Sequence, residues 1–181
     1  MSRPTHILKH EHRVIEKVLR ALEGICWRLE NDEPVPHEAL AQLLDFINNY
    51  ADHVHHAKEE KYLFPLLERS GIQDEEGPLG FLRREHATER ALLHELEQAV
   101  AELNEQGALH FVTAARQYTQ HLTRHIQQED AILFSLTEEL LDDPDKDDLL
   151  NSLTHADGQS GESAALYYEQ LAEQLDAAWT I

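Results

Sequence analysis

The sequence is poor in the residues that mark several classes of protein. Its 181 residues include a single cysteine, Cys26, so an intrachain disulfide and cysteine-rich zinc modules are excluded. No run of about eighteen apolar residues is present. The N-terminal segment MSRPTHILKHEH also lacks the apolar core of a signal peptide. We therefore expect a soluble, cytoplasmic protein in which Cys26 is a buried structural thiol.

Basic residues are also scarce. Lysine and arginine number 15 against 35 aspartates and glutamates, and the net charge is −20. Nucleic acids and anionic membrane surfaces attract basic patches, so we expect neither as a partner. The chain length and a hydrophobic content of 41% suit one domain with a sizeable core.

Glycine and proline are few as well, seven and six, and they cluster with Asn and Asp between long periodic segments. No segment alternates polar and apolar residues, so strands are not expected. We predict an all-α, up-down-up-down four-helix bundle over residues 1–141, with one or two additional helices in residues 142–181 packed on it. The four apolar-periodic segments span about residues 5–30, 36–69, 79–103 and 109–141.

Histidine, in contrast, is abundant, with thirteen copies. On a helical projection of 100° per residue, His12, His86 and His125 each lie in the middle of an apolar stripe, and Glu129 lies beside His125. A buried histidine or glutamate is costly unless it finds a partner. One such residue is most simply a satisfied core group, whereas one at similar depth in each helix indicates a shared site.

The second segment contains the stretch HVHHAKEEKYLFP, which begins at His53. It offers two pairs at the i,i+4 spacing that places side chains on one helix face, His55–Glu59 and His56–Glu60. On the same projection His56 points away from the apolar stripe. We therefore predict that His55 and Glu59 face the core. His53, His56 and Glu60 are predicted to face solvent.

An internal repeat supports this choice. HHAKEEKYLFP from His55 aligns with HIQQEDAILFS, which begins seventy residues later at His125. The alignment matches Glu59 with Glu129, but His56 has only Ile126 opposite it. It also matches the neighbouring acids and the Leu-Phe pairs of the two segments.

The first and third segments repeat in the same way. LKHEHRVIEKVLRAL and LRREHATERALLHEL align on their Glu-His pairs, so His12 corresponds to His86. The sequence thus contains two copies of a helical hairpin, and each copy carries two histidines and one glutamate of the recurring set. The residues that recur are His12, His55, Glu59, His86, His125 and Glu129.

Four histidines and two glutamates suit a dinuclear metal site. Imidazole and carboxylate ligands favour iron or manganese, and zinc also accepts them. Six protein ligands leave positions open for O₂, peroxide or NO. We predict that His12 and His55 bind one metal, that His86 and His125 bind the other, and that Glu59 and Glu129 bridge the two.

The combined pattern resembles the hemerythrin family, and more narrowly the bacterial hemerythrin-like (HHE cation-binding) domains. The motifs are EH, HxxKEExxLFP, a second EH and HxxxE before an apolar pair, and the resemblance covers about residues 5–140. It implies a non-haem di-iron centre, with two iron ions bridged by an oxo or hydroxo group and the same six ligands. Manganese or zinc remain alternatives.

One position departs from the oxygen-carrying members of that family. They have a further histidine one turn after the third-helix ligand, where this chain has Arg90. The resemblance is therefore closer to the four-histidine, two-glutamate di-iron proteins linked to nitric-oxide stress and to repair of iron–sulfur clusters. Those repair proteins carry an N-terminal cysteine-bearing segment, which this sequence does not contain.

The sequence leaves three functions open. The first is a di-iron protein that binds O₂, NO, peroxide or iron itself in oxidative or nitrosative stress or in iron handling. The second is a di-iron enzyme that turns over peroxide or NO, or that supplies iron for cluster repair. The third is a metal-free helical interaction module.

Further candidates flank the predicted ligands. Glu89 lies on the third-helix stripe one turn after His86, and His121 lies one turn before His125. Either residue is a candidate metal ligand or a partner of one. The apolar face of the last predicted helix packs on the bundle or, alternatively, forms a homodimer contact.

Overall fold

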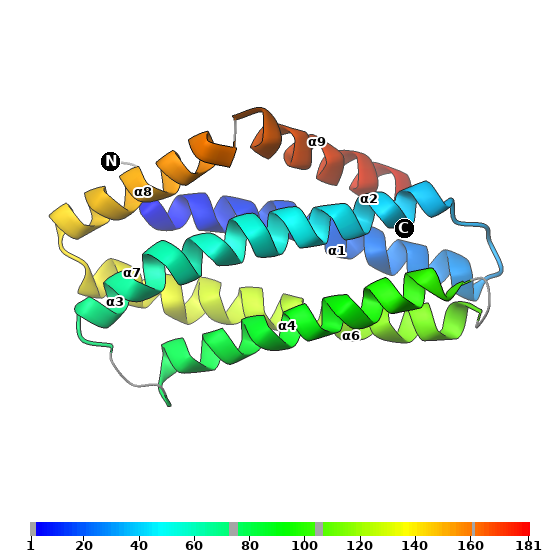
Figure 1. Cartoon of the computed structure of the whole chain (residues 1–181), viewed down its shortest axis with the longest axis horizontal. Coiled ribbons are helices and arrows are strands. Elements are labelled where there is room, and N and C mark those ends of the chain that lie inside the picture. Colours follow the sequence, from blue (N-terminus) through cyan, green and yellow to red (C-terminus); the bar gives the residue numbers. More distant parts are fainter. Residues whose placement is uncertain (1–2, 73–75, 104–106, 161) are drawn as a thin grey trace.

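The computed structural model describes residues 3–72, 76–103, 107–160 and 162–181, and these contain helices and loops but no strand. None of the described helices is long and apolar enough to cross a membrane. The four predicted helical segments are present as four long rods that run side by side (Figure 1). The all-α prediction is confirmed.

The first and third rods are uninterrupted α-helices, α1 (Pro4–Glu30) and α4 (Pro78–Ala101). Each begins with proline at its first position, where the missing N–H has no helical partner to lose. The two rods carry the Glu-His pairs of the internal repeat.

The second and fourth rods both contain π-helical turns, in which hydrogen bonds span one residue more than in an α-helix. The second rod comprises α2 (His37–Phe46), η1 (Ile47–His56), η2 (Glu59–Leu63) and α3 (Phe64–Arg69). The fourth comprises α6 (Ala108–Gln128), η3 (Glu129–Leu133) and α7 (Phe134–Leu140). The turns η2 and η3 occupy matching positions in the repeat, so the two hairpins repeat in backbone form as well as in sequence.

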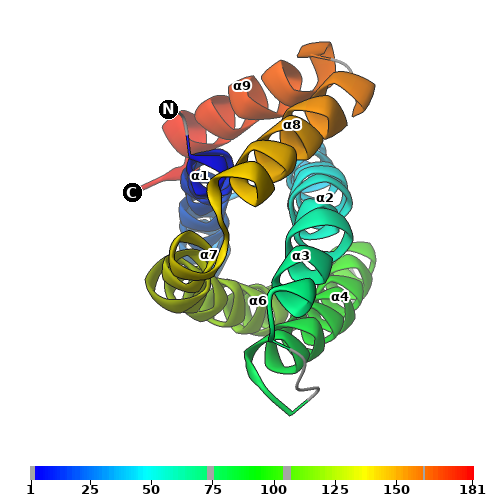
Figure 2. The ribbon, with the colours of Figure 1, turned by 90° about the vertical axis from the view of Figure 1, so that its left-hand side faces the viewer.

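Two more helices, α8 (Asp143–Ser160) and α9 (Glu162–Trp179), follow the bundle. They lie across one side of it, with α9 along α1 and α2, and α8 along α1 and η2 (Figure 2). The apolar face of α9 packs on the bundle, where Leu171 and Leu175 are buried. The prediction of additional C-terminal helices is confirmed, whereas a domain boundary after residue 141 stays a prediction.

The buried apolar residues form two clusters, one toward each end of the rods. One includes Phe46 and Phe111 together with the buried face of α9, and Cys26 is buried within it. The other includes Phe64 and Phe134. Between the two clusters lies a layer of buried polar side chains.

Gly24 allows α9 to approach α1 closely. A Cβ atom at this position would lie 1.7 Å from the carbonyl oxygen of Trp179. Gly24→Ala should therefore displace the end of α9, at an overpacking cost of about 1–3 kcal/mol. This outweighs the gain in helix propensity of about 1 kcal/mol. We expect faster hydrogen exchange in residues 171–179 and a lower melting temperature.

The control is His6→Ala, which alters an exposed residue of the same helix and should change neither measurement. A Gly24→Ala variant with unchanged protection of α9 would contradict the close approach.

Candidate metal centre

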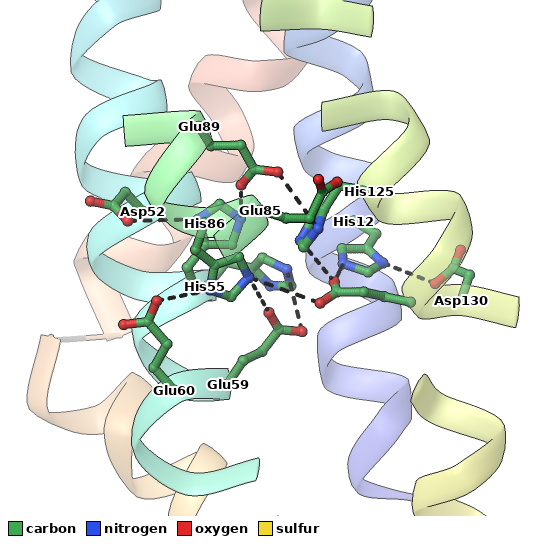
Figure 3. Close-up of polar contacts among 12 residues, drawn as sticks. His12, Asp52, His55, Glu59, Glu60, Glu85, His86, Glu89, His125 and Asp130 are labelled. Atoms are coloured by element: carbon green, nitrogen blue, oxygen red, sulfur yellow. Dashed lines mark hydrogen bonds and ion pairs between the residues drawn. The ribbon is translucent and has the colours of Figure 1, made fainter. Parts of the chain in front are cut away.

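The structure brings all six predicted ligands together in the middle of the bundle. Figure 3 labels His12, His55, Glu59, His86 and His125 among them. The six residues come from all four rods, and each has an exposed fraction of 0% or 1%. Glu59 and Glu129 are the first residues of the π-helical turns η2 and η3. Such turns often occur at functional sites.

The imidazole nitrogens face the two carboxylates. The Nε2 atoms of His12 and His125 lie 3.2 and 3.3 Å from Oε2 of Glu129. His86 Nε2 lies 3.4 Å from Glu59 Oε2 and 3.9 Å from Glu129 Oε1. His55 Nε2 lies 3.8 Å from Glu59 Oε1. Glu129 therefore contacts histidines of both hairpins.

These atoms converge without forming hydrogen bonds. Within the described residues, no hydrogen-bond partner is found for Nε2 of any of the four histidines or for either oxygen of Glu59 and Glu129. Buried polar atoms without partners are rare and costly, so their concentration in one place needs an explanation. Cations bound at this point would satisfy all eight atoms at once.

The converging atoms form two groups, within each of which the ligand atoms lie within 4.8 Å of one another. The glutamates Glu59 and Glu129 belong to both groups, as bridging carboxylates must. The donor set therefore fits two metal ions. The first group is completed by His12 and His55, and the second by His86 and His125.

Carboxylates hold the opposite nitrogen of three of these histidines. The Nδ1–H of His12 donates to Asp130 at 2.9 Å, and that of His55 donates to Glu11 at 2.9 Å. The Nδ1–H of His86 donates to Glu60 at 2.8 Å. A proton held on Nδ1 leaves the lone pair of Nε2 directed at the centre of the site, as in many metal-binding histidines.

The repeat extends to these supporting contacts. Glu60 and Asp130 match in the repeat, and each binds a histidine of the other hairpin. The matched phenylalanines behave alike, since Phe134 stacks on the ring of His12 and Phe64 stacks on that of His86.

The expectation that Glu60 faces solvent needs correction. Its side chain is 34% exposed, but its Oε1 atom accepts two hydrogen bonds. One comes from Nδ1 of His86, and the other comes from Arg90 at 3.0 Å. Arg90 also donates to Asp52 at 2.8 Å. The arginine that replaces the extra histidine of oxygen carriers thus holds a carboxylate that orients a predicted ligand.

The expectation for His56 is wrong. This residue is 1% exposed, its ring stacks on His86 with centroids 4.2 Å apart, and its Nε2 lies 3.2 Å from Oε2 of Glu89. The helical projection assumed 100° per residue, but His56 ends the π-helical stretch η1, where each residue advances by less. The accumulated difference turns His56 inward. His53 is exposed, as predicted.

His56 and Glu89 form a third group of donors, which overlaps the second group in His86 and His125. Ligand atoms of His56, His86, Glu89 and His125 lie within 4.8 Å of one another. Glu89 is 2% exposed and neither of its oxygens has a hydrogen-bond partner among the described residues. His121 is more peripheral, with Nε2 3.5 Å from carboxylate oxygens of both Glu85 and Glu89.

Burial and mutual charge shift the pKa values of the cluster in opposite directions. Burial, reinforced by the charge of Glu129, raises the pKa of Glu59 well above its ordinary value. Burial would also raise the pKa of Glu129, but the charges of His125 and His12 lower it far below normal. Burial disfavours the charged form of His125, but the negative charge of Glu129 raises the pKa of His125 to about 9. Protons therefore compensate the buried charge where no metal does.

Comparison with known proteins agrees with this chemistry. The family model of the hemerythrin HHE cation-binding domain matches residues 3–137. The chain belongs to this family. The match spans every residue of the two donor groups, while α8 and α9 follow it. No curated protein and no solved structure was found to match the chain. Membership of a cation-binding family and the buried His/Glu clusters together suggest a metal-binding site.

Metal binding by this hemerythrin domain should weaken as the pH falls. Burial raises the pKa of Glu89 to about 8, and the pKa of His125 is about 9, so both groups bind protons at neutral pH. A metal must displace those protons, and each proton displaced changes affinity about tenfold per pH unit. We expect the affinity for zinc to rise steeply between about pH 6 and 8 and to level off above about 9.

Zinc competition against a chelator measures this affinity without redox chemistry. Glu89→Gln removes one of the titrating groups and should make the dependence shallower. An affinity that does not change between about pH 6 and 8, after correction for the chelator, would contradict the assignment.

Proposed function

We propose that this hemerythrin domain holds two metal ions, iron in its working form, and that the centre binds a small exogenous ligand such as O₂, NO or peroxide. The supporting observation is the set of eight buried, unpartnered ligand atoms, arranged as two groups that share two carboxylates. Iron held in this way supplies a redox-active centre for such ligands.

The two ions would share Glu59 and Glu129. His12 and His55 would complete the first site, and His86 and His125 the second. His56 and Glu89 form a further group with His86 and His125. In that group Oε1 of Glu89 lies 3.6 Å from Nδ1 of His125, whereas Glu129 lies 3.3 Å from Nε2 of the same ring, so Glu89 lies on the side of His125 opposite the shared carboxylate.

The space beside the cluster favours a very small ligand. A cavity of about 10 Å³ is lined by His56, Glu89 and Tyr118, and the Arg90–Asp52 ion pair forms another part of its wall. This is about the space that one water molecule needs. Diatomic molecules, peroxide and metal ions match this scale, whereas organic substrates do not.

A second candidate function is iron storage or supply. Glu89, whose side chain is 2% exposed, lies between the buried cluster and His121, and His121 lies in turn beside Glu85, the side chains of both being 11% exposed. Metal-binding side chains thus continue from the site toward the surface. This arrangement favours exchange of the metal itself.

Metal analysis of the purified protein tests the proposal. We expect two iron ions per chain, with near-ultraviolet charge-transfer absorption that changes on addition of peroxide or NO. Glu129→Gln should lose both ions because it removes a shared donor, while His12→Ala should lose one. His53→Ala, an exposed neighbour on the second rod, is the control.

Full metal content in His12→Ala, His86→Ala and Glu129→Gln together would overturn the site assignment. Two bound iron ions that pass readily to a chelator, with a spectrum insensitive to O₂, NO and peroxide, would favour iron supply instead. A colourless protein that takes up no iron would favour the interaction module.

His56→Ala separates the two donor groups. We expect one of the two ions to bind at least about tenfold more weakly, since even residues that only support ligands change metal affinity by about 10–100-fold. The other ion should bind as before. Isothermal titration with zinc measures both events, and His53→Ala, an exposed neighbour on the same rod, serves as the control. Two unchanged binding events in His56→Ala would show that His56 is only a buried neighbour.

A further inference from the structure

A chain of ion pairs connects helix α8 to the metal centre. The ammonium group of Lys58 contacts both the Glu11 and the Asp157 carboxylates. The second oxygen of Glu11 accepts the hydrogen bond from Nδ1 of His55 at 2.9 Å. The order of contacts is therefore Asp157, Lys58, Glu11, His55.

Three members of this chain are buried. The side chains of Lys58, Glu11 and His55 are 3%, 5% and 1% exposed, and that of Asp157 is 32% exposed. A buried ammonium group needs charged or hydrogen-bonding partners on several sides. Asp157 supplies one of the two carboxylates that Lys58 contacts, so its loss leaves Glu11 as the single charged partner of Lys58 in the described contacts.

The second hairpin has no equivalent chain of ion pairs among the described residues. Gln128 stands at the repeat position of Lys58, and Glu85 stands at that of Glu11. Glu85 lies near His121 instead of holding His125. The contact to α8 is therefore specific to the half of the site built on His55.

We infer that Asp157 is a positioning residue of the metal centre. It holds Lys58, Lys58 holds Glu11, and Glu11 orients His55. Residue 157 lies outside the segment that the family model matches, so α8 adds to the site a contact that the matched domain does not contain. Docking of α8 and retention of metal are then coupled, and by thermodynamic reciprocity each strengthens the other. The inference rests on the proposed function.

The test compares three full-length variants loaded anaerobically with ferrous iron. Glu11→Gln should weaken iron binding by about 10–100-fold, the range seen when a residue supporting a metal ligand is lost. Asp157→Asn, one contact further away, should release iron to a colorimetric chelator several-fold faster than wild type. Asp157→Glu should restore slow release.

A second measurement does not depend on release rates. Zinc loading should slow hydrogen exchange in residues 143–157 of the wild-type protein, because metal binding stabilises the docked helix. Asp157→Asn should abolish this protection even when both metal positions are filled.

The matched control is Asp176→Asn. Asp176 of α9 binds the Arg20 guanidinium of α1 through two hydrogen bonds of 2.7 and 3.1 Å, so its loss loosens the extension without touching the Lys58 chain. Iron release from Asp176→Asn should match wild type.

The results that would contradict this inference differ from the result that would contradict the proposed function. Equal release from wild type and Asp157→Asn, with two ions bound in both, overturns the inference and leaves the proposed function intact. Equally fast release from Asp176→Asn and Asp157→Asn also overturns it, because general loosening of the extension then suffices. A wild-type protein that binds no metal overturns the proposed function itself.

Discussion

A layer of buried ionisable side chains crosses the middle of the bundle, between its two apolar clusters. An isolated charge in an apolar interior is prohibitively costly, and several charges remain costly unless each finds a partner. Here the Nε2 atoms of the four predicted histidine ligands and the oxygens of Glu59 and Glu129 point at one another, and none of them has a hydrogen-bond partner among the described residues. The two apolar clusters must therefore hold the rods together while the layer between them relies on bound cations or protons. Any cation that binds only the folded chain also stabilises it.

The contacts that orient the buried histidines cross between the two hairpins, so neither hairpin can complete the cluster alone. Asp130 of the second hairpin orients His12 of the first, and Glu60 of the first orients His86 of the second. Glu59 and Glu129, the two predicted bridging residues, also come one from each hairpin. Because these contacts cross between the hairpins, assembly of the buried cluster depends on correct pairing of the hairpins, and the cluster and the bundle should form in one cooperative event.

Sequence periodicity sufficed for the four rods and for six buried residues of the site, because the helical period and the repeat both report local register. It failed at His56, since a projection at constant rotation cannot detect the π-helical stretch that turns this residue inward. Sequence periodicity could not predict the contacts of Glu60 and Asp157 either. Their partners, His86 and Lys58, are distant in sequence, and no local pattern specifies such contacts.

The departures from the repeat fall on different halves of the centre. His56 and Glu89 lie beside the half that contains His86 and His125, and they line a small cavity there. The half that contains His12 and His55 is the one tied to α8 through Lys58. If the cluster holds two metals as proposed, the repeat supplies the shared ligands and these asymmetric residues make the surroundings of the two metals different. One metal would then lie beside a space of water-molecule size, and the other would be tied to a helix outside the matched family domain.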